Sequence, residues 1–76
     1  MSNYYLASGF TVNLGVIKAV CMEFESDNKT DLHNQASNYL RDTFRSPPVL
    51  HNSISVYKIE GHGDYKTLVS VKARGV

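Results

Sequence analysis

Three histidines, one cysteine and a few carboxylates are the residues best suited to chemistry in this chain of 76 residues. The histidines and the cysteine are His33, His51, His62 and Cys21. They do not stand at the spacings typical of metal sites or of nucleophilic catalysis, such as C-x-x-C or H-E-x-x-H. A free cysteine within a strand usually packs as a small apolar side chain. We therefore expect no metal, no cofactor and no catalytic residue, with Cys21 packed inside and the histidines on the surface.

Two further patterns invite a catalytic or phosphate-binding interpretation. Glu23 and Glu25 share one strand face. A carboxyl group that acts as a general acid needs apolar surroundings, and nothing apolar surrounds these two. The segment 61–63 has two glycines, as phosphate-binding loops have, but no helix follows it to bind an anion with its N-terminus. A solvated strand end and a hairpin turn are the simpler interpretations, so we expect a protein that is not an enzyme.

Basic residues gather toward the C-terminal end. From residue 58 onward there are four basic and two acidic residues, a local net charge of +2, whereas residues 1–57 carry four against five, a net −1. Basic side chains on one face of a strand, beside a tyrosine such as Tyr57 or Tyr5, are typical of a platform for single-stranded bases. Binding of single-stranded nucleic acid is the alternative function, with these candidate contacts: Lys58, Lys66, Lys72 and Arg74.

Non-covalent binding to another protein is the function that we favour. The polar face of the predicted helix is rich in amides and arginine and poor in lysine and glutamate, which suits a direct interface. The chain also holds five tyrosines, too many for so small a core to hide, and exposed tyrosine is favourable at interfaces. The candidate partner-binding residues are Asn34, Asn38, Arg41, Arg45 and Tyr5.

The elements that must position these residues begin with a β-hairpin. Residues 4–12 and 16–25 alternate with a period of two, and Asn13-Leu14-Gly15 between them tolerates a positive φ. Gly9 indicates a bulge or a close approach by another backbone. We expect the core-facing residues of this hairpin to be Leu6, Phe10, Val20, Met22 and Phe24.

A helix and a second hairpin follow. One helical stripe consists of Leu32, Ala36, Tyr39, Leu40 and Phe44. Thr30 is the expected N-cap, and the helix should end near Arg45 because two prolines follow. Residues 53–60 and 65–74 are predicted strands around a glycine-rich turn. Within the first of them the apolar parity switches at Val56-Tyr57, which a bulge or burial on both faces explains.

The element order is therefore β-β-α-β-β, in one domain that spans residues 1–76. Short turns make both hairpins antiparallel, so we expect an α+β fold with a four-stranded antiparallel sheet in order 2-1-3-4 or 1-2-4-3. One helix covers one face and packs on the strand residues above together with Val69 and Val71. The other face and the sheet edges stay open, and a partner protein or a second copy is expected to cover them.

Composition narrows the class further. With 42% apolar residues, 20% charged residues and a net charge of +1, the chain is neither disordered nor strongly basic. One cysteine cannot form an internal disulfide, and every apolar run is far shorter than the roughly 20 residues that cross a bilayer. We expect a cytoplasmic protein with no membrane partner.

Three segments carry a resemblance of organisation that spans almost the whole chain. They are the hairpin YYLASGFTVNLGVIKAVCMEF, the helix DLHNQASNYLRDTF and the hairpin ISVYKIEGHGDYKTLVSV. A single sheet-and-helix domain of this kind resembles small phage-encoded inhibitors, including some anti-CRISPR proteins. The resemblance implies a non-enzymatic protein that occupies a surface of a host protein complex, often a surface built for nucleic acid.

Overall fold

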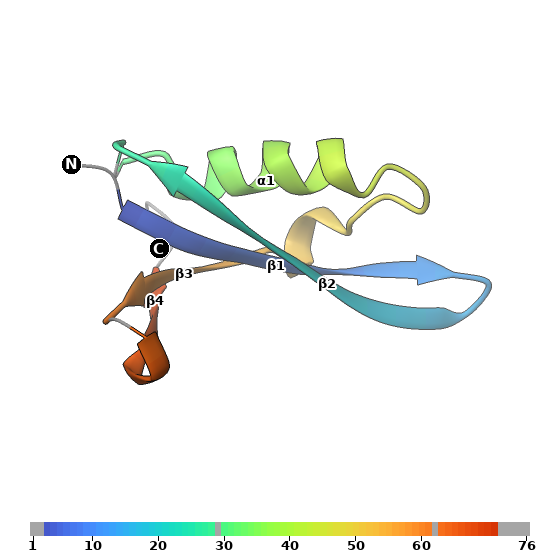
Figure 1. The fold of residues 1–76 in the computed structure, drawn as a ribbon. Helices are drawn as coiled ribbons and strands as arrows, with labels where there is room; N and C mark the ends of the chain where they lie inside the picture. Colours follow the sequence, from blue (N-terminus) through green and yellow to red (C-terminus); the bar gives the residue numbers. More distant parts are fainter. Residues whose placement is uncertain (1–2, 29, 62, 72–76) are drawn as a thin grey trace.

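The computed structural model describes residues 3–28, 30–61 and 63–71. These residues form the elements β1 (Asn3–Asn13), β2 (Val16–Ser26), α1 (Leu32–Thr43), η1 (His51–Ser53), β3 (Ser55–Glu60), η2 (Gly63–Tyr65) and β4 (Thr67–Val71), where η marks a short 3-10 turn. The strands form one antiparallel sheet in the order β2-β1-β3-β4, and α1 lies over one of its faces (Figure 1). The predicted α+β fold is confirmed, with the first of the two expected strand orders.

The strand pairing runs without interruption in the described residues. β1 and β2 pair from Asn3↔Ser26 to Asn13↔Val16 in one register, so Gly9 lies in no bulge. β3 likewise keeps one register with each neighbour; Val56 is buried on the α1 side, and Tyr57 is half-buried on the other. β3 has no bulge, so its inner position explains the parity switch: its α1 side is buried at Val56, and its other side is half-buried although α1 does not cover it.

The side of β1 that faces α1 is not the one that the alternation predicts. Tyr5 and Ala7 are buried, whereas Leu6 is half-buried and Phe10 is exposed on the far face. The prediction that Leu6 and Phe10 face the core is wrong. Small residues such as Ala7 let the helix layer pack close to the sheet, and Tyr5 fills the remaining space by stacking on Phe24, with ring centroids 5.5 Å apart.

The core lies between α1 and this side of the sheet. It consists of Tyr5, Ala7, Phe24, Leu32, Ala36, Leu40, Val49 and Val56, with Val20, Met22, Phe44, Ile54 and Val71 packed against it. Two residues expected in the core, Tyr39 and Val69, are 41% and 45% exposed. Both lie at its margin, since Val69 is on the edge strand β4 and Tyr39 only reaches the rim with its ring against Phe24.

Both ends of α1 differ slightly from the prediction. Asp31 rather than Thr30 precedes the helix, and the backbone N–H of Thr30 donates to Asn28 Oδ1 at 2.9 Å. Thr30 therefore closes a local turn instead of capping α1. The helix ends at Thr43, two residues before the expected end, and Phe44 N–H donates to Leu40 O at 2.8 Å. β4 begins at Thr67 because Tyr65 belongs to η2; the predicted residues 72–74 lie outside the described part of the chain.

The connection after α1 runs back along β1. Leu50 N–H donates to Phe10 O at 2.8 Å, and Phe10 N–H donates to Ser53 Oγ at 2.9 Å. This brings Val49 over Gly9, so the close approach expected there is made by a side chain and not by a backbone. Beyond this point the β1–β2 hairpin continues as a projecting ribbon (Figure 1).

Candidate protein-binding surface

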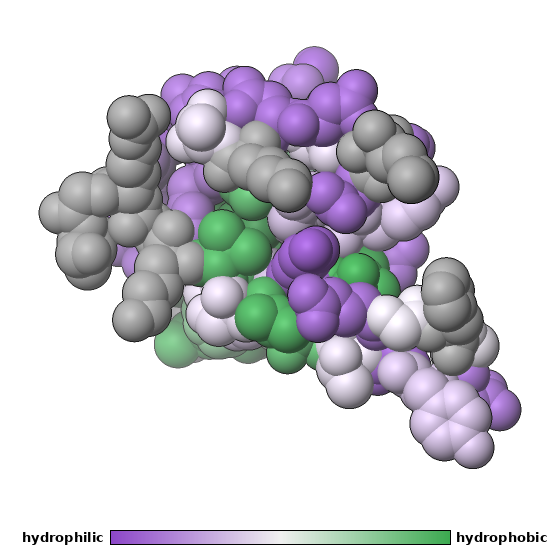
Figure 2. Space-filling model, turned by 90° about the vertical axis from the view of Figure 1, so that its left-hand side faces the viewer, coloured by the Kyte–Doolittle hydropathy of each residue, from purple (hydrophilic) through white to green (hydrophobic). Residues whose placement is uncertain are grey.

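The face of the sheet that α1 does not cover is apolar across three strands. Directly paired residues share a face, so the pairs Leu6↔Tyr57 and Ile59↔Leu68 gather four large side chains there. Tyr4 and Phe10 extend the group along β1, and Leu68 is 54% exposed. Figure 2 shows hydrophilic side chains over α1 at the top and hydrophobic ones at the level of the sheet below. We call this surface the open face: Tyr4, Leu6, Phe10, Tyr57, Ile59 and Leu68.

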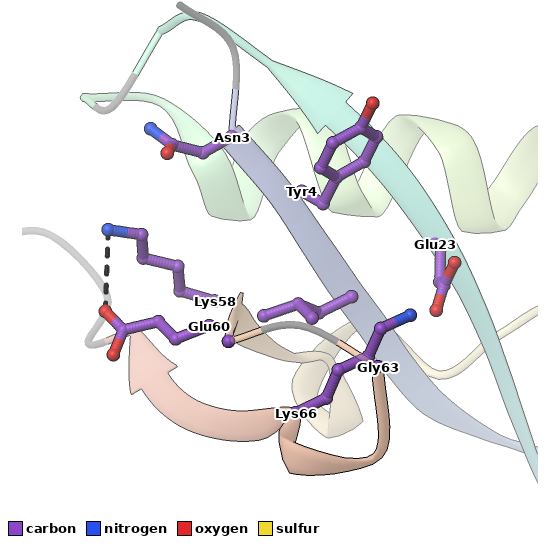
Figure 3. A pocket seen from close by; sticks show the side chains of 9 residues that line it. Asn3, Tyr4, Glu23, Lys58, Glu60, Gly63 and Lys66 are labelled. Atoms are coloured by element: carbon purple, nitrogen blue, oxygen red, sulfur yellow. Dashed lines mark ion pairs between the residues drawn. The ribbon is translucent and has the colours of Figure 1, made fainter.

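A hollow of about 570 Å³ adjoins the open face at Tyr4, where β1 and β3 stop pairing. Charged side chains line it from both sides, and Figure 3 shows those of Lys66 and Glu23 pointing toward one another. Lys58 Nζ lies 3.5 Å from Glu60 Oε1. Two ammonium groups thus face two carboxylates, a balance that does not favour an anionic ligand such as phosphate.

The predicted nucleic-acid contacts do not share one face in the described residues. Lys58 pairs with Tyr5 and so lies on the α1 side of the sheet, whereas Tyr57 pairs with Ser70 on the open face. Lys66 precedes β4 in the hollow. Lys72 and Arg74 lie outside the described residues.

Three of the predicted partner-binding residues lie on the exposed side of α1: Asn34, Asn38 and Arg41. Arg45 is exposed as well, but it follows the end of the helix at Thr43. Arg41 Nη2 lies 2.9 Å from His51 Nδ1, and Arg45 Nε donates to Asp42 O at 3.2 Å.

The prediction that Tyr5 contacts a partner is wrong, because this residue is buried. Its side chain is only 2% exposed and stacks on Phe24 inside the core. Its neighbour Tyr4, 58% exposed, is the tyrosine that reaches the open face. Which of the two tyrosines is exposed depends on which side of β1 faces α1, and the alternation pattern predicts the wrong side.

The residues that could do chemistry remain dispersed. Cys21 is exposed, contrary to the expectation that it packs inside, because it pairs with Ser8 of β1 and so lies on the face that α1 does not cover. His33 is half-buried on α1 and His51 lies in η1, while His62 is outside the described residues. Among the residues that the structure describes, no three His, Cys, Asp or Glu side chains gather where they could hold a metal ion.

Comparisons with protein-family models, with curated proteins and with solved structures give no match. In the described part of the chain, no helix has the length and apolar character needed to cross a membrane.

Periodicity predicts an uncovered sheet face but not which β1 residues line it. Leu6 and Phe10 belong to the more apolar side of β1, which the alternation therefore places in the core. A usable signal was present on the other side of β1, since Ala7 and Gly9 are the small residues that a closely packed layer needs.

Proposed function

We propose that this protein is a non-enzymatic binding module that docks on another protein with the open face of its sheet. In this role it would resemble the small phage-encoded inhibitors that occupy a surface of a host protein complex. The observation that carries the proposal is the cluster of Leu6, Tyr57, Ile59 and Leu68 on a face that α1 leaves uncovered.

The composition of the open face suits binding. Contiguous apolar patches on a monomer mark interaction sites, because removing such surface from water is favourable. Tyr4 and Tyr57 can anchor the centre of an interface at low entropic cost. The rim near Tyr4 carries Glu23 and Lys66, so the expected partner presents an apolar strip with polar side chains at its margin.

Quantitative binding to a purified partner tests this function. Proteins crosslinked to the full chain in extracts of its native cells are identified, and the strongest candidate is purified for calorimetry. Leu68→Glu should weaken the affinity at least about tenfold, since it places a charge in an apolar interface. Leu14→Glu is the matched control, because Leu14 is 96% exposed in the β1–β2 turn, outside the open face.

Equal affinities of the wild type and Leu68→Glu, with both folded by circular dichroism, would contradict the proposal. The nucleic-acid alternative is measured in parallel by fluorescence anisotropy with a single-stranded oligonucleotide. Affinity that falls steeply with salt and is lost in the variant with Lys58, Lys66, Lys72 and Arg74 all changed to Gln would establish that alternative instead.

A further inference from the structure

We infer that β2 pairs antiparallel with β2 of a second copy of the chain, which joins two four-stranded sheets edge to edge. This inference concerns the edge of the sheet and does not rest on the proposed function of the open face. Its steps follow from the direction of the backbone groups, the exposure of the hairpin and the charges along β2.

The backbone groups of alternate β2 residues point outward. Phe10 directs its N–H to Ser53 Oγ and its C=O to Leu50 N, both away from β2. Because this direction alternates along a strand, Gly9 and Thr11 bond to β2, and their partners Val20 and Lys18 bond back. The alternate residues of β2 therefore direct their N–H and C=O groups to the open edge of the sheet: Ile17, Ala19, Cys21 and Glu23.

This edge lacks the usual devices that prevent pairing. β2 has 11 residues in one register, without proline, and Lys18 is the one charged residue from Val16 to Met22. Natural edge strands are usually short, bulged or interrupted by charges and proline. The other edge of the described sheet, β4, has 5 residues. The β2 edge is therefore the one suited to receive another strand.

The end of the hairpin is uncovered on both faces. Val16 and Ile17 are 66% and 69% exposed although they point to opposite sides, and the ribbon projects past the rest of the sheet (Figure 1). A two-stranded ribbon is marginally stable by itself, and a third strand stabilises it. In an antiparallel pair, the body of one copy would lie beside the projecting ribbon of the other.

The charges along β2 are compatible with a second copy as that third strand. When all of Val16–Ser26 pairs with its copy, Lys18 lies opposite Phe24, and Glu23 and Glu25 lie opposite Ala19 and Ile17. Like charges, which would destabilise a two-fold pairing of identical strands, therefore do not stand directly opposite one another.

One register gives full overlap of the two strands. Pairing all of Val16–Ser26 with its copy puts Cys21 opposite Cys21 and Val20 opposite Met22. A hollow of about 570 Å³, lined by Val20, Thr43 and Phe44 among others, lies beside this edge at the end of α1. Met22 of the second copy would lie at the wall of that hollow, where it could pack on the apolar side chains of Val20 and Phe44.

Sedimentation equilibrium of the full chain tests the dimer. We expect a dimer in the micromolar range for the wild type and a monomer for Ala19→Pro, which removes an outward N–H but no β1–β2 hydrogen bond. Ala19→Thr retains the N–H and should remain dimeric. The inference is overturned by a monomeric wild type at 200 µM, or by a folded Ala19→Pro variant that still dimerises.

Crosslinking with the short reagent bis(maleimido)ethane tests the register. Each maleimide adds one Cys21 thiolate, so the wild type should give a covalent dimer in high yield. In Cys21→Ser/Ala19→Cys the two thiols are offset by four residues, roughly 13 Å, and the yield should fall severalfold. A higher yield in that variant would overturn the Cys21-centred register. A dimer lost in Leu68→Glu but kept in Ala19→Pro would overturn the edge and assign dimerisation to the open face.

Discussion

Gly9 lies against the side chain of Val49, and a Cβ added to Gly9 would come within 2.6 Å of Val49 Cγ1. Val49 is buried and cannot move aside freely. Gly9→Ala should therefore lower the free energy of unfolding by about 1–3 kcal/mol through overpacking, measured by urea denaturation.

The double variant Gly9→Ala/Val49→Ala isolates this contact. Removing Cγ1 from residue 49 relieves the overlap, so the loss of stability should be clearly smaller than the sum of the two single losses. Additive losses would mean that the steric contact is not the cause.

Leu14 occupies an unfavourable position in the β1–β2 turn. Its φ is 52°, in the left-handed region, and its side chain is 96% exposed. Leu14→Asn should raise the free energy of unfolding by about 0.5–1 kcal/mol, because asparagine tolerates this conformation and no contact is lost. Thermal denaturation measures the gain. Leu14→Val should have the opposite effect, and equal stabilities of the three proteins would contradict the explanation.

Tyr4 and Tyr5 form a matched pair on opposite faces of β1. Tyr5→Ala should cost about 3–5 kcal/mol, since it empties the space beside Phe24, and in so small a domain the cooperative unfolding transition should be lost. Tyr4→Ala should cost less than about 1 kcal/mol. Circular dichroism against temperature checks both variants. The reverse order would mean that the assigned face of β1 is wrong.

Ser26 ties the end of β2 to α1. Its hydroxyl donates to Gln35 Oε1 at 2.6 Å and accepts from Asn28 N–H at 3.1 Å, and the residue is buried. Ser26→Ala should cost about 1–3 kcal/mol because polar groups lose their partner. Thr30→Ala, which alters an exposed turn, should cost less in the same urea titration. Equal costs would contradict a special role of the buried hydroxyl.

Periodicity predicted which elements form, and local turn chemistry predicted both hairpins. Periodicity left the strand order open, since either order satisfies the same patterns; it is decided by pairs such as Ala7↔Val56, which join distant parts of the chain. The two sides of β1 are both apolar enough to be buried, so hydrophobicity favoured Leu6 and Phe10, whereas close packing selects Ala7 and Gly9. Alternation carries no information about layer spacing.

The candidate surfaces follow the same division. The exposed side of α1 was predictable because the helical stripe identifies its buried side, and Asn34 and Arg41 lie where the stripe places them. An uncovered sheet face was predictable too, but its β1 residues were not, because they depend on which side of β1 faces α1. The expectation that Cys21 packs inside rests on the usual behaviour of a free cysteine in a strand. Its exposure follows from the absence of a second layer over that face among the described residues.

The position of β1 inside the sheet has a consequence for how the chain reaches its native state. The first strand to be synthesised needs β3 as its second neighbour, and Tyr5 must wait for Lys58, 58 − 5 = 53 positions later. The hairpin can close early from local contacts, but the core waits for this long-range contact, which is slow to form. During that interval the β3 side of β1 is an unpaired edge, so nascent chains would be most prone to mispairing before β3 has left the ribosome.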